Sequence, residues 1–414
     1  MDFSARLPAV LDDNPLALAV AARRAAGQPI HDLTLSNPTR AGLAYPTAEI
    51  AAALAALAAG AASPYEPSPR GHRSARSAIA AYYNHRGPCA IDPDRLHLTA
   101  STSEAYSLLF KLLGDSGAEI LAPHPSYPLI EHLAALDGWR ARPYPLVLDS
   151  NAWRLDHAAL ATAVTPATRA IAVIHPHNPT GWLMRGGADA HSLLDLCASR
   201  NLALIADEVF LDYPAPGHEQ FAQSFAAHEV SALTFTLGGL SKSCALPHLK
   251  LGWIHVGGPP PLVAAAQARL DFIADAYLSV ATPVQAAAPR LLELGIGLRA
   301  QIQSRLAENF AALTLSSVEG LTPSPVEGPA NATWPAGFQV LPRAAGWSAL
   351  LRRPPAPDEE LLARQLLDRA GVLAHPGYFF DFPEPGWHVL SLLPEPEKFR
   401  AALAALRDWL PRLV

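Results

Sequence analysis

The chain contains few cysteines, and their distribution excludes two classes of small stabilised fold. Only three of its 414 residues are cysteine, and they lie far apart with no CxxC pair. An odd and scattered set supports neither a disulfide framework nor a zinc site with cysteine ligands. We therefore expect a protein of the cytoplasm.

Long runs of like charge and long apolar runs are also missing. Thirty-one Lys and Arg residues against 37 Asp and Glu residues give a net charge of -6, spread along the chain, which argues against binding to nucleic acid or an anionic membrane. The most apolar stretch, Ile50–Ala62, is mainly alanine and falls short of the roughly 20 residues that span a bilayer. We predict an ordinary helix there, no signal peptide at the start of the chain, and small molecules as partners.

Half of the residues are hydrophobic, enough to bury a large core in a chain of this length. In the middle of the sequence, short apolar runs alternate with segments of helical pattern such as 103–113 and 188–199. The apolar runs are 119–122, 170–174, 202–206, 232–237 and 251–256. Continuous runs of this kind are typical of strands buried on both faces, so we predict an α/β fold with a mainly parallel sheet.

The composition of the sequence changes after residue 295. Residues 261–294 read as a long helix or a helix pair that leads out of the sheet domain, and a Pro/Gly-rich stretch (322–336), a strand-like run (347–351) and a final helix from Glu395 follow. We predict a large α/β domain over 46–290 and a smaller α/β domain over 291–414. Residues 1–45 are expected to pack with the smaller domain, because chain termini often lie together.

Polar residues follow the predicted strands at 124–127, 175–180, 207–208 and 238–242. In open α/β sheets, ligands bind beyond the carboxyl ends of the strands, so these segments are expected to line one crevice. His175 and His177 lack a third ligand at a suitable spacing, and we predict no metal site. No GxGxxG or Walker motif occurs, which excludes the standard dinucleotide and nucleoside triphosphate sites.

Lysine is scarce, with Lys111, Lys242, Lys250 and Lys398 as its four occurrences. A reaction that needs an amine able to lose its charge must use one of them. Lys242 follows a predicted strand in a segment of small residues, where a ligand can approach the backbone closely. Taken alone, such a lysine is better explained as an exposed loop residue.

Seven short segments resemble, in the same order, those of the class I and II aminotransferases, which are fold-type I enzymes dependent on pyridoxal phosphate. They cover almost the whole chain, and a single segment such as Asn178–Gly181 carries little weight by itself. The segments are Leu35–Pro38, Tyr65–Gly71 with Arg76, Thr99–Ala105, Pro125–Tyr127, Asn178–Gly181, Asp207–Phe210, and Leu240–Lys242 with Pro247–Trp253.

The resemblance implies two catalytic residues. Lys242 would bond the cofactor as an internal aldimine and later move the α-proton of the substrate, since a desolvated lysine is a nucleophile near neutral pH. Asp207 would pair with the ring nitrogen and keep it protonated, which maintains the electron sink. Without the resemblance, Asp207 is explained as a strand-end residue that caps the next turn.

The resemblance also implies further contacts with the cofactor. Its phosphate would bind at a helix N-terminus, a ready anion site, although an N-cap alone explains the hydroxyl residues there. In the family, a neighbouring subunit contributes one tyrosine to the site, so the resemblance implies a homodimer. The contacts are Ser101, Thr102, Ser103, Ser241 and Lys250 at the phosphate, Tyr127 stacked on the ring, Asn178 at the phenolic oxygen, and Tyr65 at the phosphate from the neighbouring subunit. A turn-forming Asn-Pro pair also explains Asn178, and ordinary packing explains the two tyrosines.

Three positions of the cofactor site depart from the family pattern. Phe210 stands where the family has a tyrosine that donates to the phenolic oxygen, so that oxygen would rely on Asn178 and the pKa of the internal aldimine should be raised. Lys250 replaces an arginine, and a point charge gives a less directional phosphate contact than a guanidinium. Gly239 replaces a phosphate-binding serine. We expect a modest affinity for the cofactor.

The largest departure lies near the C-terminus, where Val389 takes the place of the arginine that pairs with the substrate carboxylate. Candidate substrate contacts are Ser36, His388 and Arg352, with Arg353 and Arg40 as further possibilities. Alternatively, the substrate amine has no adjacent carboxylate. We expect ordinary α-amino acids such as aspartate to be poor substrates.

These features predict a pyridoxal-phosphate-dependent aminotransferase that transfers an amino group from an amino acid or related amine to a 2-oxo acid. A lyase or decarboxylase on the same scaffold is one alternative, because a fold does not determine which bond breaks. A homologue that binds the cofactor without turnover is another, with Phe210, Gly239 and Val389 as signs of lost activity.

Overall fold

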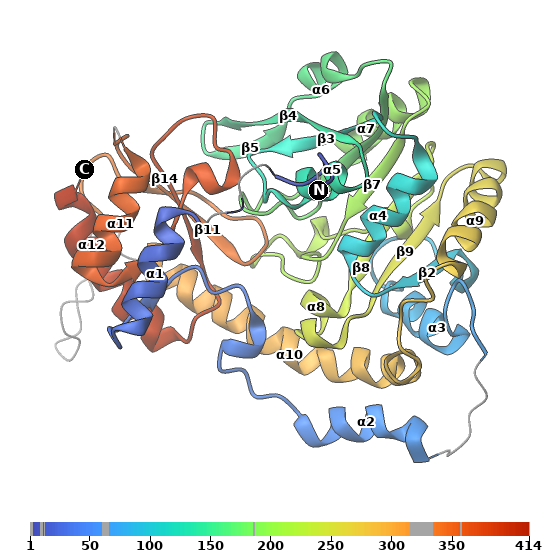
Figure 1. Ribbon diagram of the computed structural model, residues 1–414, viewed down its shortest axis with the longest axis horizontal. Helices are drawn as coiled ribbons and strands as arrows, with labels where there is room; N and C mark the ends of the chain where they lie inside the picture. Colours follow the sequence, from blue (N-terminus) through green and yellow to red (C-terminus); the bar gives the residue numbers. More distant parts are fainter. Residues whose placement is uncertain are drawn as a thin grey trace.

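The computed structural model contains a large and a small sheet-bearing domain, joined by the long helix α10 (Thr282–Thr314) (Figure 1). It describes residues 3–8, 11, 13–59, 66–184, 187–314, 334–356 and 358–413. Within these ranges, no helix combines the length and hydropathy needed to cross a bilayer.

The large domain is built on an eight-stranded sheet of order β2-β9-β8-β7-β6-β3-β4-β5. Strands β4, β3, β6, β7 and β8 pair in parallel, whereas β9 runs antiparallel to both of its neighbours and β5 runs antiparallel to β4. The strands are β2 (Leu96–Thr99), β3 (Glu119–His124), β4 (Arg140–Asp149), β5 (Ala152–Leu155), β6 (Thr168–Ile174), β7 (Ala203–Asp207), β8 (Thr234–Gly239) and β9 (Gly252–Gly257). Each of the five predicted apolar runs forms a strand, with ends that differ by at most two residues. The predicted α/β class is confirmed.

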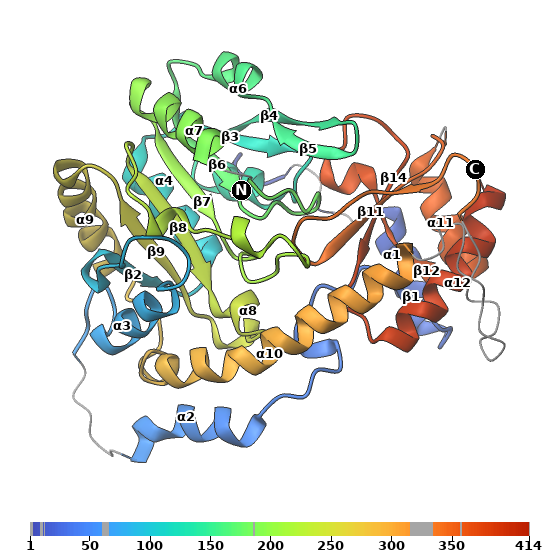
Figure 2. The same ribbon diagram turned by 180° about the vertical axis from the view of Figure 1, so that it is seen from behind.

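Helices cover both faces of this sheet (Figures 1 and 2). Because successive side chains of a strand point to opposite faces, Ala170, Ala172 and Ile174 pack against α4, α5 and α9, whereas Ile171 and Val173 pack in a second cluster with α6 and α7. The helices of the domain are α2 (Thr47–Ala59), α3 (Arg73–Tyr82), α4 (Thr102–Leu113), α5 (Leu129–Leu136), α6 (His157–Ala163), α7 (Gly187–Ser199), α8 (Leu240–Ser243) and α9 (Pro260–Asp275).

The small domain carries an antiparallel sheet of order β10-β11-β14-β13. Its N-terminal addition consists of α1, which packs on α11 through Leu16 and Val20, and of β1, which pairs in parallel with β12. The elements are α1 (Pro15–Ala25), β1 (His31–Asp32), β10 (Gln339–Val340), β11 (Ser348–Arg352), α11 (Glu359–Ala370), β12 (Val372–Leu373), β13 (His375–Pro376), β14 (Trp387–Ser391) and α12 (Pro396–Leu413). Short 3-10 helices are η1 (Pro38–Arg40), η2 (Pro93–Arg95), η3 (Glu219–Phe221), η4 (Phe225–Ala227), η5 (Pro247–Leu249) and η7 (Gly377–Phe380).

The helix that joins the two domains is continuous across the predicted boundary between residues 290 and 291. The predicted helical segment 261–294 divides into α9 and the first turns of α10. Helix α2 runs beside the large-domain half of α10 (Figures 1 and 2). Tyr65 and most of the predicted Pro/Gly-rich stretch lie outside the described residues.

Candidate active site

Lys242 and Asp207 lie at the same edge of the large sheet. Asp207 is the last residue of β7 and pairs with Leu237 of the neighbouring parallel strand β8, which leads directly into α8 and Lys242. Asp207 is buried, Lys242 is half-buried as a whole residue, and their charges interact. Burial lowers the pKa of Lys242 to about 8, against the opposing effect of Asp207.

Asp207 is buried with few donors around it. Burial raises its pKa to about 6, although hydrogen bonds and the Lys242 charge act in the opposite direction. The backbone N–H of Val209 donates to Oδ1 at 3.2 Å, and the hydroxyl of Tyr106 on α4 donates to Oδ2 at 3.3 Å. The carboxylate is therefore ionised at neutral pH and can serve a positively charged group.

Aromatic rings enclose the amine of Lys242. Its Nζ atom lies 4.7 Å from the ring centre of Trp347 and 5.6 Å from that of Phe210. The Tyr213 hydroxyl donates to the Lys242 carbonyl oxygen, and Arg299 Nη1 donates to the Ser243 carbonyl oxygen at 2.7 Å. These two donors fix the short helix α8 and hence the base of the lysine side chain.

Asn178 follows β6 and is half-buried. The hydroxyl of Ser348 on β11 donates to Asn178 Oδ1 at 3.4 Å. Because the amide oxygen is engaged in this way, the amide nitrogen remains as a donor. Neither Ser348 nor Trp347 is singled out by the sequence motifs.

The N-terminus of α4 begins with a capping box. Ser101 Oγ accepts from the Glu104 N–H at 3.1 Å, and Glu104 Oε2 accepts from the Ala100 N–H at 2.6 Å. Helix geometry leaves further N–H groups of the first turn for an anion. Ser101, Thr102 and Ser103 are half-buried.

Glycines let β9 pass close to this region. A Cβ atom at Gly252 would lie 3.0 Å from the backbone carbon of Ser101, and one at Gly239 would lie 3.1 Å from the carbonyl oxygen of Leu251. This close approach gives a physical reason for glycine where the family has a serine. Ser241 is half-buried on α8, and Lys250 is exposed after η5.

Tyr127 lies in the loop after β3 and is 52% exposed. Its ring centre is 6.3 Å from that of Phe380 in η7. The adjacent Ser126 N–H donates to the Phe380 carbonyl oxygen at 2.8 Å. This loop therefore links the large domain to the small one, and the Tyr127 side chain remains exposed.

Val389 lies in an apolar environment between the domains. It is 2% exposed on β14 and packs in the same cluster as Leu350, Trp182, Phe380 and Trp387. Its position in the strand places it on the face that meets the large domain. The position of the usual arginine is thus occupied by a buried hydrophobic side chain, which offers no charge to a carboxylate.

The candidate substrate contacts in the small domain are engaged elsewhere. His388 is fully buried, and its Nε2 accepts from Arg353 Nε at 3.2 Å, while Arg353 Nη2 pairs with Glu359 at 2.7 Å. Burial, with a smaller effect of Arg353, lowers the pKa of His388 to about 3. Arg352 is exposed, with its guanidinium 5.4 Å from the ring centre of Trp387. These contacts argue against substrate roles for all three.

The N-terminal candidates lie in the loop that includes η1. Ser36 and Arg40 are both exposed. Within the described part of the chain, no contact of either residue indicates a binding site for a substrate carboxylate. Their roles as substrate contacts stay predictions.

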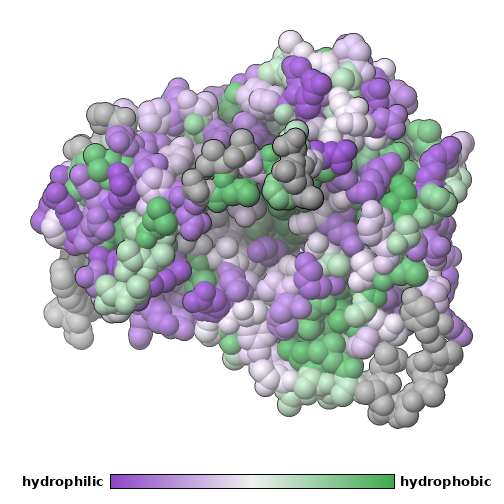
Figure 3. Space-filling view, in the orientation of Figure 1, coloured by the Kyte–Doolittle hydropathy of each residue, from purple (hydrophilic) through white to green (hydrophobic). Residues whose placement is uncertain are grey.

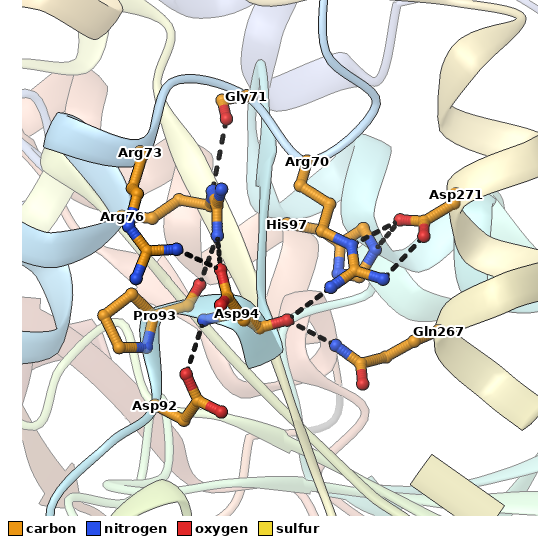
Figure 4. Close-up of polar contacts among 10 residues, drawn as sticks. All are labelled: Arg70, Gly71, Arg73, Arg76, Asp92, Pro93, Asp94, His97, Gln267 and Asp271. Atoms are coloured by element: carbon orange, nitrogen blue, oxygen red, sulfur yellow. Dashed lines mark hydrogen bonds and ion pairs between the residues drawn. The ribbon is translucent and has the colours of Figure 1, made fainter. Parts of the chain in front are cut away.

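The segment that follows Tyr65 is anchored by a network of charged residues (Figure 4). Arg70 forms a bidentate pair with Asp271 at 2.6 and 2.7 Å, and His97 Nε2 lies 2.8 Å from the same carboxylate. Arg76 donates to Pro93 O at 2.7 Å and to Asp94 at 2.9 Å. Burial alone would raise the pKa of Asp271, but the hydrogen bonds from His97 and Arg70 outweigh it and hold that pKa well below its ordinary value.

The histidines of the 175–180 segment serve local contacts. His175 Nε2 lies 3.2 Å from Gln223 O, and His177 Nδ1 lies 2.8 Å from Thr180 Oγ1. A different group, His124, Glu131 and Asp381, places three potential ligand atoms within 4.8 Å of one another. His124 and Glu131 are already within hydrogen-bond distance at 3.0 Å. The absence of a metal stays a prediction.

Comparison with known proteins gives one consistent family. Residues 30–406 match the model of the family described as aminotransferase class I and II. The alanine aminotransferase of Mycobacterium tuberculosis is 27% identical over 320 residues, which cover 77% of this chain and 71% of that protein. The S-alkyl-thiohydroximate lyase of Arabidopsis thaliana is 30% identical over 226 residues, 52% of this chain and 46% of that protein.

Solved structures show the same fold. The alanine aminotransferase from Pyrococcus furiosus superposes with a TM-score of 0.83 at 21% identity, over 99% of this chain and 100% of that one. At this level of identity the likeness concerns the arrangement of the chain.

Proposed function

Because this chain belongs to the class I and II aminotransferases, a family of pyridoxal-phosphate-dependent enzymes, we propose that Lys242 bonds the cofactor and that Asp207 pairs with its ring nitrogen. The chain is an aminotransferase, and the predicted family, cofactor and type of reaction are confirmed. The placement of a buried amine and a buried carboxylate at the ends of neighbouring parallel strands carries the assignment of these two residues.

The residues at this edge of the sheet fit the cofactor in charge and hydrogen-bonding capacity. A buried carboxylate suits a protonated ring nitrogen, the half-buried N-terminus of α4 suits a phosphate, and the amide nitrogen of Asn178 suits an oxygen acceptor. When bound, pyridoxal phosphate supplies an aldehyde carbon and an electron-accepting ring. Ser101, Thr102, Ser103, Ser241, Lys250, Tyr127 and Tyr65 keep their predicted roles as proposals.

Lys242 acts twice in this proposal. With its pKa lowered to about 8 by burial, about a tenth of its amine is neutral at pH 7, far more than for an ordinary lysine, and can attack a carbonyl carbon. Once a substrate amine has displaced it, the same Nζ atom takes the proton from the substrate α-carbon and returns it. The donors to the Lys242 and Ser243 carbonyl oxygens hold the helix still while the side chain moves.

Asp207 keeps a proton at the ring nitrogen. Its pKa of about 6 in the cofactor-free pocket means that it is ionised above that pH, and a cation beside it would lower the pKa further. The negative charge is therefore in place at neutral pH, held toward the ring by Tyr106 and the Val209 N–H.

Val389 leaves the site without the arginine that pairs with the substrate carboxylate in the family pattern, and this bears on the amino donor. We propose that the preferred donor has an uncharged group in place of that carboxylate, and that aspartate is a poor donor. Alanine and isopropylamine form a matched pair, because isopropylamine has a methyl group where alanine has a carboxylate. Isopropylamine should convert the visible band of the bound cofactor at least as fast as alanine; rapid conversion by aspartate or alanine, with none by isopropylamine, would contradict the proposal.

A lyase is the second candidate, favoured by the absence of the arginine and by the likeness to the plant lyase. The two reactions leave different products. Transfer of nitrogen to an added 2-oxo acid identifies the aminotransferase, whereas release of a cleaved side-chain fragment without transfer identifies the lyase.

Large hydrophobic side chains on α9, the turn after it and α10 support a homodimer. Phe272 is 82%, Tyr277 53% and Ile296 61% exposed. Hydrophobic surface also gathers over α2 and the adjoining part of α10 (Figure 3). A second copy of the chain would cover this face and bring its Tyr65 to the phosphate. Sedimentation velocity at micromolar concentration should give a dimer, and a monomer would contradict this. The cytoplasmic location stays a prediction from composition.

The assignment of Lys242 is tested with purified protein and added pyridoxal phosphate. We expect a visible absorption band that borohydride removes, a covalent adduct after reduction, and loss of that adduct in Lys242→Ala. An adduct that persists in the variant would contradict the assignment.

A further inference from the structure

Trp347 is the closest aromatic neighbour of the Lys242 amine among the contacts of the described residues. It precedes β11 of the small domain, is 4% exposed, and has its ring centre 4.7 Å from Nζ. The ring meets those of Phe210 at 5.5 Å and Tyr213 at 5.1 Å, both edge to face. Its position is therefore fixed by packing on two sides.

The indole Nε1 of Trp347 is buried and has no hydrogen-bond partner in the part of the chain that the structure describes. A buried donor without an acceptor destabilises the fold, and native proteins rarely keep one without a use. A bound molecule that offers an oxygen beside Lys242 would satisfy it.

Two neighbouring features indicate which oxygen this is. Phe210, which touches the Trp347 ring, has no hydroxyl at the position where the sequence comparison expects a donor to the phenolic oxygen of the cofactor. The residue after Trp347, Ser348, donates to the amide oxygen of Asn178 at 3.4 Å and so leaves the amide nitrogen of Asn178 as a donor. Trp347 thus contacts Phe210 and Ser348 contacts Asn178, the two positions that the family resemblance assigns to the phenolic oxygen.

We propose that the Nε1–H of Trp347 donates a hydrogen bond to the phenolic oxygen of bound pyridoxal phosphate, in place of the missing tyrosine hydroxyl. The proposal rests on Lys242 as the cofactor-bonding residue. A hydrogen bond to this oxygen stabilises the oxygen as an anion. It therefore favours loss of the proton from the nitrogen that joins Lys242 to the cofactor. Trp347 therefore lowers the pH at which the visible band of the substrate-free enzyme changes, and offsets the effect of Phe210.

The test is a spectrophotometric pH titration of the cofactor-loaded protein without substrate. Trp347→Phe keeps a ring in place and removes the N–H, and it should raise the titration midpoint by about one pH unit, a tenfold change in proton affinity. Trp153→Phe is the matched control, since its Nε1 is also buried without a partner among the described residues, while its ring packs against Phe382 and Trp387. The control should leave the midpoint unchanged.

A second variant keeps the test decisive if Trp347→Phe fails to fold. Phe210→Tyr in the otherwise unchanged chain should shift the midpoint little, because the oxygen already has its donor; in the Trp347→Phe background it should restore the original midpoint. An unchanged midpoint in Trp347→Phe, or a fall of about one pH unit in Phe210→Tyr alone, would overturn the proposal.

Two further outcomes separate the possible failures. An unchanged midpoint with weaker binding of amine donors to Trp347→Phe would assign the N–H to the substrate and overturn the inference alone. Absence of any visible band in the unaltered protein would contradict the role of Lys242 itself.

Discussion

Two regions of the molecule treat their charged groups in opposite ways. In the network of Figure 4, which we call the Asp271 network (Arg70, Arg73, Arg76, Asp94, His97, Gln267 and Asp271), every arginine meets a carboxylate and every carboxylate meets an arginine. In the Lys242 pocket (Lys242, Asp207, Asn178, Phe210 and Trp347), burial shifts both ionisable groups toward neutrality, and an indole donor has no partner among the described residues.

The comparison teaches which region stabilises the chain and which is kept for chemistry. Partners hold the pKa of Asp271 below its ordinary value, so ionised Asp271 stabilises the folded state. Burial lowers the pKa of Lys242 and raises that of Asp207, so it destabilises the charged form of each group. Buried groups whose pKa values are shifted in this way are typical of functional sites.

Loss of the pocket amine should have the largest effect on activity. Lys242→Ala removes both the nucleophile and the proton carrier, and we expect activity to fall on the order of 10³-fold or more. Turnover with the best donor and the adduct mass after borohydride reduction check this. Lys398→Ala, an exposed lysine of α12, is the control and should behave as the unaltered chain. Comparable activity in the two variants would contradict the account.

Loss of the pocket carboxylate should rank second. Asp207→Asn keeps the size of the side chain but removes the charge that holds the ring nitrogen protonated, and we expect kcat/KM to fall on the order of 10²- to 10³-fold. Asp195→Asn on the exposed side of α7 serves as the matched charge change. Equal loss in both variants would indicate a general effect of charge.

Removal of the buried amine should stabilise the cofactor-free protein. Because the folded pKa of Lys242 is lowered to about 8 from about 10.4 in an unfolded chain, the unfolded state binds more protons between these values. Unfolding free energy should therefore rise with pH across this window. At pH 7 we expect Lys242→Met to be more stable than the unaltered chain by about 1–2 kcal/mol, measured by urea denaturation. A lower unfolding free energy in Lys242→Met than in the unaltered chain would contradict the contrast between the two regions.

Removal of a charge from the Asp271 network should have the opposite sign. Asp271→Asn leaves Arg70 without its anion and weakens the hydrogen bond with His97, and we expect a loss of about 1–2 kcal/mol in unfolding free energy with near-normal kcat. Since its folded pKa is depressed, this contribution is present above about pH 4 and is lost as the pH falls below that. Glu293→Gln, in an exposed pair with Arg290, should change stability by less than about 0.5 kcal/mol.

The strands were accessible from sequence because their signals are local, whereas the proposed roles of Lys242 and Asp207 came from the family resemblance. Continuous apolar runs report burial on both faces, and Asp207 and Lys242 each follow such a run. The ends of parallel neighbours meet at one edge, so their proximity followed from the order of the strands.

Contacts between distant segments could not be read in this way. Arg70 and Asp271 are 201 residues apart, and Trp347 and Ser348 reach the site from the other domain. Local patterns carry no information about such pairs, although an aromatic residue at the start of a small-domain strand was a weak signal for Trp347.

Strand geometry explains why neighbours of Val389 are poor substitutes for the arginine. Adjacent residues of a strand face opposite sides, so His388 points away from the surface that Val389 presents. It lies in the core of the small domain with Arg353 and Leu351. Proximity in sequence was therefore a misleading guide to proximity in the site.

Borohydride trapping followed by peptide mass mapping tests the central claim most directly, because the chain has only four lysines to distinguish. The account predicts a single reduced cofactor adduct, on the peptide that contains Lys242. An adduct on Lys111, Lys250 or Lys398 in its place, or no adduct in protein saturated with pyridoxal phosphate, would contradict it.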